Sequence, residues 1–145
     1  MIDYCVPPGE AVGLKKVRHS IINVWRPIRT IKRDPLALSD ARSIPEEDLV
    51  HVTTYLAKGR TNMTWGVLPP AVDEKTGRQE KHKWYWCSEM TPDEVFLFKI
   101  LDSKLDGRAR RDPHSAFHIE GTEGEETRQS IEMRCMVFWE DEPKE

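Results

Sequence analysis

The sequence predicts a mostly β protein, of the sandwich or jelly-roll type, with short helical turns. Ten Pro and eight Gly interrupt the 145 residues, which leaves little room for long helices. The apolar fraction is 38% and includes five Trp, enough for one core. Several short runs are rich in β-branched and aromatic residues, and counting them gives six to eight strands. We therefore expect a single domain over residues 1–145.

The best strand lies near the end of the chain, at Ser130–Trp139. Its apolar residues alternate onto one face, as listed here: Ile131, Met133, Cys135, Val137 and Trp139. A second strand, His19–Arg26, is β-branched and aromatic and is followed by Pro27. Ser115–Ile119 is a shorter candidate.

The middle of the chain offers two further predictions. Thr64–Leu68 and Trp84–Ser88 read as strands on either side of the polar stretch Ala71–Lys83, which predicts a hairpin with a long loop. The aromatic group Trp84–Trp86 is either half core and half surface or part of a substrate pocket. Thr91-Pro92-Asp93-Glu94 has the form of a capping box, so we expect one helical turn and then a buried strand, or a continuing helix.

Composition excludes several functions. There are 22 Lys and Arg against 25 Asp and Glu, a net charge of −3, so a basic nucleic-acid binder is not expected. No apolar run approaches the ~20 residues of a membrane span. No secretory signal, nucleotide-binding glycine motif or G-x-S-x-G motif is present. Three widely spaced Cys favour a reducing, cytoplasmic location. The acidic residues Asp102, Asp106 and Asp112 lie among basic ones, which suggests a solvated, salt-bridged loop.

Two local patterns could carry chemistry. Arg128 and Ser130 share a face where the last strand begins, and a guanidinium beside a hydroxyl suits a carboxylate. His114 lies fourteen positions earlier, at the entrance to another strand candidate. Both patterns also have ordinary explanations, a solvated surface arginine and a hydrogen-bonded loop histidine. His118 is interpreted as structural, because Pro113 argues against a helix that would pair it with His114.

Longer segments give a specific resemblance. The chain resembles the fungal hydroxylase/desaturase family of the AsaB/CmcJ/NvfI type, which consists of Fe(II)/2-oxoglutarate-dependent oxygenases of secondary metabolite biosynthesis. The matching segments, in the family's order, are IINVWRPI (21–28), DPLALSDARSIPEEDLV (34–50), KWYWCSEMTPDEVFLFKILDSKLDGRARRDPHSAF (83–117) and RQSIEMRCMVF (128–138). The resemblance implies a double-stranded β-helix, of which this chain is the C-terminal part.

The resemblance also implies a site for Fe(II) and the co-substrate 2-oxoglutarate. The family's distal iron ligand falls on His114, and its 2-oxoglutarate clamp falls on Arg128, assisted by Ser130. Arg134 lies on the same face of the strand and is the second choice for a carboxylate partner. A facial triad of two His and one carboxylate leaves open positions for the co-substrate and O₂.

The sequence departs from the family at its first residues. The family's H-x-D motif falls on Met1-Ile2-Asp3, so Asp3 matches the carboxylate ligand while Met1 occupies the His position. A thioether is a poor Fe(II) ligand. Three explanations stay open: a shortened gene product without iron chemistry, a wrongly assigned start, or an iron site of Asp3, His114 and water.

Two functional hypotheses follow. The first is an oxidoreductase that hydroxylates or desaturates a small-molecule substrate, with catalytic residues Asp3 and His114. The alternative is a non-catalytic, truncated remnant or β-rich interaction domain without a complete iron site. No nucleic-acid or membrane partner is expected, and exposed strand edges would favour homo- or hetero-oligomers.

Overall fold

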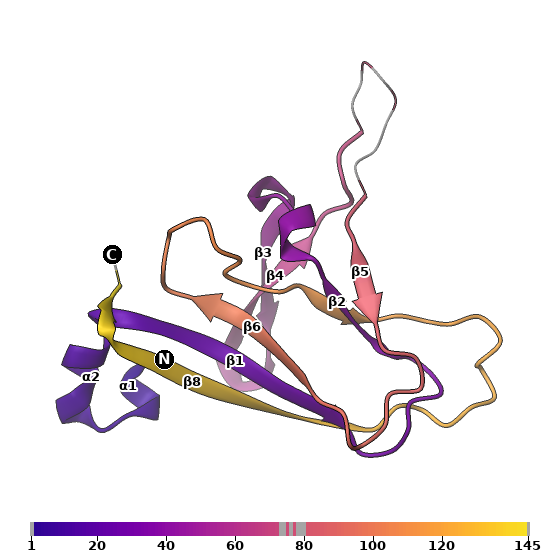
Figure 1. The fold of residues 1–145 in the computed structure, drawn as a ribbon, viewed down its shortest axis with the longest axis horizontal. Coiled ribbons are helices and arrows are strands. Elements are labelled where there is room, and N and C mark those ends of the chain that lie inside the picture. Colours follow the sequence, from indigo (N-terminus) through magenta and orange to yellow (C-terminus); the bar gives the residue numbers. More distant parts are fainter. Residues whose placement is uncertain (1, 73–74, 76, 78–80, 145) are drawn as a thin grey trace.

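The computed structural model describes residues 2–72, 75, 77 and 81–144, and its largest unit is a three-stranded antiparallel sheet (Figure 1). The central strand β1 (Val17–Pro27) lies between β6 (Phe96–Asp102) and β8 (Ser130–Pro143). All three strands were predicted, and β8 continues four residues beyond the predicted end at Trp139. The mostly β fold class is thereby confirmed.

Two smaller antiparallel sheets complete the strands of the described residues. One has the order β5-β2-β7, from Trp84–Trp86, Leu36–Ser39 and His114–Ala116. The other is a hairpin of β3 (Leu49–Tyr55) and β4 (Thr61–Val67). The predicted pairing of Thr64–Leu68 with Trp84–Ser88 is therefore wrong: β4 pairs with β3, while β5 pairs with β2. Part of the polar stretch 71–83 lies outside the described residues.

Helices are short, as the Pro and Gly content predicted. The α-helices are α1 (Ile2–Cys5) and α2 (Pro8–Leu14), and both lie at the end of the large sheet where β1 begins (Figure 1). Three 3₁₀ turns are η1 (Ala41–Ser43), η2 (Glu46–Asp48) and η3 (Ala57–Gly59). Before β6, residues Thr91–Glu94 form a turn and not the predicted helical turn, and the alternative of a continuing helix is wrong. Half of the capping box is present, because Glu94 Oε2 accepts hydrogen bonds from the backbone N and the hydroxyl of Thr91. No helix of the described ranges is long and apolar enough to span a membrane.

The core lies between the large sheet and the β2 sheet. Its buried residues are Trp25, Ile31, Leu36, Met90 and Phe98. Trp25 and Phe96 stack with ring centroids 5.9 Å apart, and their strands pair directly at these two residues. Burying a large apolar side chain contributes about 1.5–3 kcal/mol, so this cluster holds the two sheets together.

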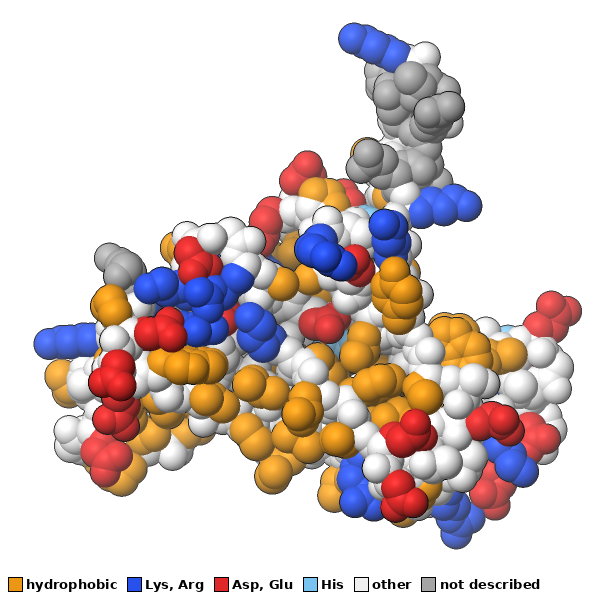
Figure 2. Space-filling view, in the orientation of Figure 1, with side chains coloured by type: hydrophobic (Ala, Val, Ile, Leu, Met, Phe, Trp, Pro, Cys, Tyr) orange, Lys and Arg blue, Asp and Glu red, His pale blue; other side chains and the backbone are white. Residues whose placement is uncertain are grey.

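The strand register assigns each residue of the large sheet to one of two faces. We call the face that carries Trp25 the inner face, and the opposite face the outer face. Glu132 pairs with Trp25 and Met133 with Val24, so the predicted apolar row of β8 lies on the outer face. There Met133 is 59% exposed, and Leu97, which pairs with Val24 from the other side, is 65% exposed. Hydrophobic side chains are also visible at the surface over β6 and β1 (Figure 2).

Candidate functional site: an inner-face arginine and a strand-entry histidine

The polar row predicted on β8 lies on the inner face. Ser130, Glu132 and Arg134 pair with Pro27, Trp25 and Asn23 of β1, respectively. Paired residues of an antiparallel ladder point to the same side, so all three share the side of the core tryptophan. Arg128 precedes the strand and reaches the same place, because its guanidinium carbon lies 5.4 Å from the centroid of the Trp25 ring.

Arg128 is the unsatisfied member of this row. Its Nη1 atom is buried and has no hydrogen-bond partner among the described residues. Buried guanidinium groups in folded proteins normally find acceptors, and an unpaired one costs free energy. A carboxylate is the natural partner, because its two oxygens match the planar fork of the guanidinium.

Arg134 is in a different situation. Its side chain is 63% exposed, and its Nε lies 3.4 Å from Glu132 Oε1. The same oxygen of Glu132 accepts a hydrogen bond of 2.9 Å from Nδ2 of the buried Asn23. Arg134 therefore already has a carboxylate neighbour, and Arg128 is the better receptor of the two predicted candidates.

His114 opens β7, where it pairs with Leu38 of β2. Its imidazole packs on Phe98 of the inner face, with ring centroids 4.5 Å apart, and Nδ1 lies 2.9 Å from the carbonyl oxygen of Asp112. An Nδ1–H that donates to this carbonyl leaves the lone pair of Nε2 free. A metal-binding histidine is usually oriented in this way.

Asp3 lies elsewhere in the described structure. It belongs to α1, and its carboxylate accepts a 2.5 Å hydrogen bond from Lys15 Nζ while the side chain remains 57% exposed. This hydrogen bond lowers the pKa of Asp3 below its ordinary value. Helix α1 sits at the end of the large sheet, away from β7, so Asp3 and His114 are not brought together (Figure 1).

The fit to an iron centre is therefore partial. No group of three or more His, Cys, Asp or Glu side chains that could hold a metal occurs within residues 2–72, 75, 77 and 81–144. His114 has the orientation of a ligand, and Arg128 has the unpaired donor that a 2-oxoglutarate carboxylate would satisfy. The described side chains thus fit the co-substrate better than they fit the metal.

The predicted solvated loop of acidic residues is only partly correct. Asp102 is fully buried and accepts hydrogen bonds from Arg18 and Lys99. Burial alone would raise its pKa, but the hydrogen bonds from Arg18, the Lys104 backbone and Lys99 outweigh burial and hold the pKa of Asp102 well below its usual range. Asp106 does fit the prediction, because it pairs with Arg108 at the surface.

The aromatic group Trp84–Trp86 is more exposed than a core strand would be. Its side chains are 38–61% exposed, although Trp86 makes an edge contact with Phe117. Cys87 is half-buried against the core, and Cys135 is half-buried as well. His118 bonds Glu123 at 2.8 Å, in keeping with a structural role.

Comparison with known proteins supplies the family. A family described as "Oxidoreductase/YMDC permease-like domain" matches residues 1–138. Hydroxylase/desaturase efuI of Hormonema carpetanum is 46% identical over 147 residues, which cover 94% of this chain and 46% of efuI. Hydroxylase/desaturase CTB9 of Cercospora beticola is 46% identical over 146 residues, which cover 97% of this chain and 43% of CTB9. The chain belongs to this fungal hydroxylase/desaturase family.

A solved structure supports the same assignment within the hydroxylase/desaturase family. The iron and alpha-ketoglutarate-dependent endoperoxidase NvfI superposes with a TM-score of 0.68 at 30% identity, over 89% of this chain and 45% of NvfI. The fold is thus the jelly roll of these oxygenases, as the resemblance implied. The chain spans about half the length of these relatives: 46% of efuI, 43% of CTB9 and 61% of asaB of Aspergillus flavus.

Proposed function

We propose that the protein acts as an Fe(II)- and 2-oxoglutarate-dependent oxidoreductase that hydroxylates or desaturates a small molecule of fungal secondary metabolism. The observation that carries the proposal is the buried Nη1 of Arg128 over Trp25, which has no partner in the described part of the chain, and Arg128 stands two residues before Ser130. Names of relatives support it, since tstK of Talaromyces stipitatus is called an alpha-ketoglutarate-dependent dioxygenase and is 36% identical over 124 residues.

In this proposal each predicted residue has one task. Arg128 binds the distal carboxylate of 2-oxoglutarate, and Ser130 adds a hydroxyl beside it. His114 offers Nε2 to Fe(II), and Asp3 is the proposed carboxylate ligand, which requires α1 to give up its contact with Lys15. The metal and 2-oxoglutarate would supply the oxidising chemistry, and the protein supplies orientation. The three free cysteines support a reducing compartment, and we propose the cytoplasm.

The first experiment measures binding of 2-oxoglutarate to the full chain by calorimetry. The Arg128→Gln variant should bind at least about tenfold more weakly, because it removes a charge-assisted hydrogen bond. Arg134→Gln is the matched control and should bind like the unmodified protein, since Arg134 is exposed and faces Glu132. Equal losses in both variants would show that the two arginines act only as general positive charge, and the proposed clamp would be wrong.

A second experiment examines His114. Mn(II), which is paramagnetic, broadens the NMR signals of nearby protons, so it should broaden the imidazole signals of His114. His118 serves as the internal control, because its Nε2 is 2.8 Å from Glu123 and it is not a proposed ligand. Selective broadening of His118, or of neither ring, would remove His114 from the metal site.

A second candidate function is a β-rich domain without iron chemistry. It is favoured by the salt bridge of Asp3 with Lys15 and by the absence of a three-ligand group among the described side chains. The two candidates differ in one product. With Fe(II) and either a substrate or a reductant such as ascorbate, the oxygenase would convert 2-oxoglutarate and O₂ to succinate and CO₂, and the second oxygen atom would go to the oxidised substrate or to water. The domain without iron chemistry would bind 2-oxoglutarate and release no succinate.

A further inference from the structure

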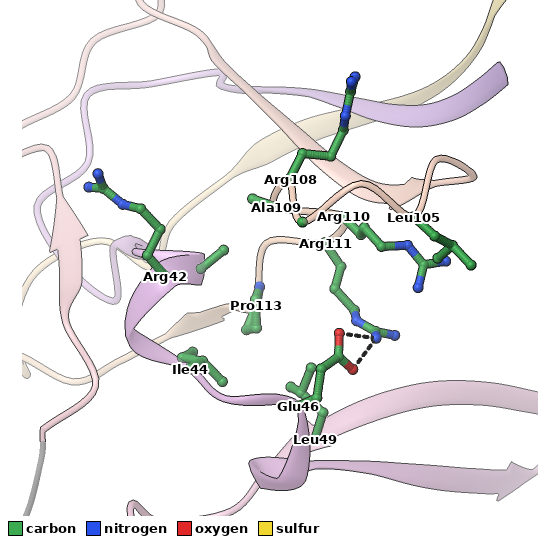
Figure 3. Close-up of a pocket in the computed structure, with 12 residues that line it drawn as sticks. Arg42, Ile44, Glu46, Leu49, Leu105, Arg108, Ala109, Arg110, Arg111 and Pro113 are labelled. Carbon is green, nitrogen blue, oxygen red and sulfur yellow. Dashed lines mark hydrogen bonds and ion pairs between the residues drawn. The ribbon is translucent and has the colours of Figure 1, made fainter. Parts of the chain in front are cut away.

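A cavity of about 510 Å³ lies between two segments that are far apart in the sequence (Figure 3). One segment is 41–49, which includes η1 and η2, and the other is 105–113, which leads into β7. Much of the wall is apolar, from the residues Ala41, Ile44, Leu49, Leu105, Ala109 and Pro113. Pro113 directly precedes His114, so the cavity adjoins the entrance to β7.

The charged part of the wall is strongly positive. It contains four arginines and one carboxylate, that of Glu46. Three of the arginines pair with acidic residues: Arg42 with Asp40, Arg108 with Asp106, and Arg111 with Glu46. The side chains of Arg42 and Arg108 extend away from Glu46 (Figure 3), so Arg110 and Arg111 are better placed to receive a ligand.

Arg111 is held in place but incompletely hydrogen-bonded. Its guanidinium lies 4.2 Å from the centroid of the Trp65 ring, and its side chain is only 18% exposed. Nη2 donates to both oxygens of Glu46, at 2.7 Å to Oε1, while Nε is buried without a partner among the described residues. A carboxylate placed on the Nε–Nη2 edge of the fork would satisfy both nitrogens.

Glu46 makes a replaceable partner for Arg111. Its side chain is 68% exposed, whereas Arg111 is fixed by Trp65 and crosses from one segment to the other (Figure 3). An ion pair with such an exposed carboxylate contributes little to stability, because water solvates the acid almost as well. Arg110 adds positive charge and is oriented by the hydrogen bond from its Nε to the carbonyl oxygen of Asp102.

We propose that this cavity binds an apolar small molecule that carries a carboxylate, and that the ligand's carboxylate displaces Glu46 from Arg111. The apolar wall takes the body of the molecule, and the Nε–Nη2 edge of Arg111 takes its acid group. Identification of this acid as the substrate rests on the proposed oxygenase function, because only then does the neighbouring His114 belong to a reaction centre.

The experiment titrates the full chain with octanoate at neutral pH and follows binding by calorimetry. Octanol has the same chain without charge and tests the acid group, and octyl phosphate tests whether another oxyanion is preferred. We expect octanoate to bind at least about tenfold more tightly than octanol, as a charge-assisted pair of hydrogen bonds requires. Equal binding of octanoate and octanol, or tighter binding of octyl phosphate, would overturn the carboxylate assignment.

Two pairs of variants test the displacement. Arg111→Gln should weaken octanoate binding about tenfold, whereas Arg42→Gln, a paired arginine of the same wall, should leave it unchanged. Glu46→Gln should tighten binding, by about two- to fivefold, because it removes the competing carboxylate. Its control is Glu47→Gln, an exposed neighbour outside the wall. A gain of affinity cannot come from misfolding, so tighter binding by Glu46→Gln would support the displacement. Weaker or unchanged binding by a Glu46→Gln variant that keeps the circular dichroism spectrum of the unmodified protein would contradict it.

The test of the acid-binding cavity can be separated from the test of the 2-oxoglutarate clamp. Arg128→Gln should lose 2-oxoglutarate and keep octanoate, while Arg111→Gln should do the reverse. If the unmodified protein binds 2-oxoglutarate but not octanoate, the acid-binding cavity is refuted and the proposed function stands. If it binds octanoate but not 2-oxoglutarate, the proposed function is refuted.

Discussion

Arg18 and Arg128 lie at opposite ends of the same strand pair, and both lie over a tryptophan ring. Arg18 pairs across the sheet with Trp139 and lies 4.0 Å from its ring centroid, and Arg128 lies 5.4 Å from that of Trp25. Arg18 donates to Asp102 and Glu142, whereas Nη1 of Arg128 has no partner among the described residues. Residue type and ring contact are alike, so the completeness of the hydrogen bonding is what separates an arginine that supports the fold from one that can receive a ligand.

The largest expected effect on stability comes from removing Asp102, the carboxylate that pairs with Arg18. Asp102→Ala leaves Arg18, which is 12% exposed, without its buried partner, and should lower the free energy of unfolding by about 3–5 kcal/mol. Asp106→Ala is the matched control, because Asp106 is a partner of Arg108 at the surface and its loss should change stability little. Urea unfolding followed by circular dichroism measures both. Equal effects would mean that burial of the pair contributes nothing.

The pH dependence of stability follows from the same carboxylate and should be the next largest effect. The pKa of Asp102 lies below its ordinary value of 3.8 in the folded chain, so the unfolded chain takes up the proton first. The stabilisation is complete above pH ~4 and is lost as the pH falls further towards the folded pKa. Asp106 contributes in the same direction, because its hydrogen bond with Arg108 lowers the pKa of Asp106 to about 2.

Unfolding of the protein and of the Asp102→Asn variant across the acid range checks this sign. The unmodified protein should become less stable as the pH drops below about 4, and the variant should show a shallower decline over the same range. A decline of equal steepness in the variant would assign the acid sensitivity to other carboxylates.

The comparison also shows which features the sequence could predict. Strands β1, β6 and β8 and the hydrogen bonds between Thr91 and Glu94 were predicted because their signals are local: alternation, β-branched runs, a proline stop and a capping pair three residues apart. The polar row that begins at Ser130 is local too, since a period of two fixes its face.

Features that depend on distant partners were not predicted. Asp102 reads as a loop acid because its partner Arg18 lies 84 residues away, and the Arg111–Glu46 pair joins residues 65 apart. The predicted pairing of Thr64–Leu68 with Trp84–Ser88 was wrong for a similar reason. The strand that pairs with β4 is Leu49–Tyr55, which is mostly exposed and gives too weak an apolar signal to be predicted as a strand. The convergence of Asp3 on His114 also depends on distant partners, and the structure places Asp3 beside Lys15 instead.

The smallest expected change in stability belongs to Arg128, and it sharpens the comparison most. Arg128→Met keeps an unbranched apolar stem over Trp25 and removes the unpaired donor, so the free energy of unfolding should stay within about 1 kcal/mol of the unmodified value or rise. Arg18→Met makes the same chemical change over Trp139 but leaves the buried Asp102 with only Lys99 as a side-chain donor, so it should destabilise clearly. Parallel urea titrations give the two differences. If Arg128→Met proved as damaging as Arg18→Met, the unpaired guanidinium would be a structural element of the inner face, and its assignment as a receptor for a ligand carboxylate would lose its physical basis.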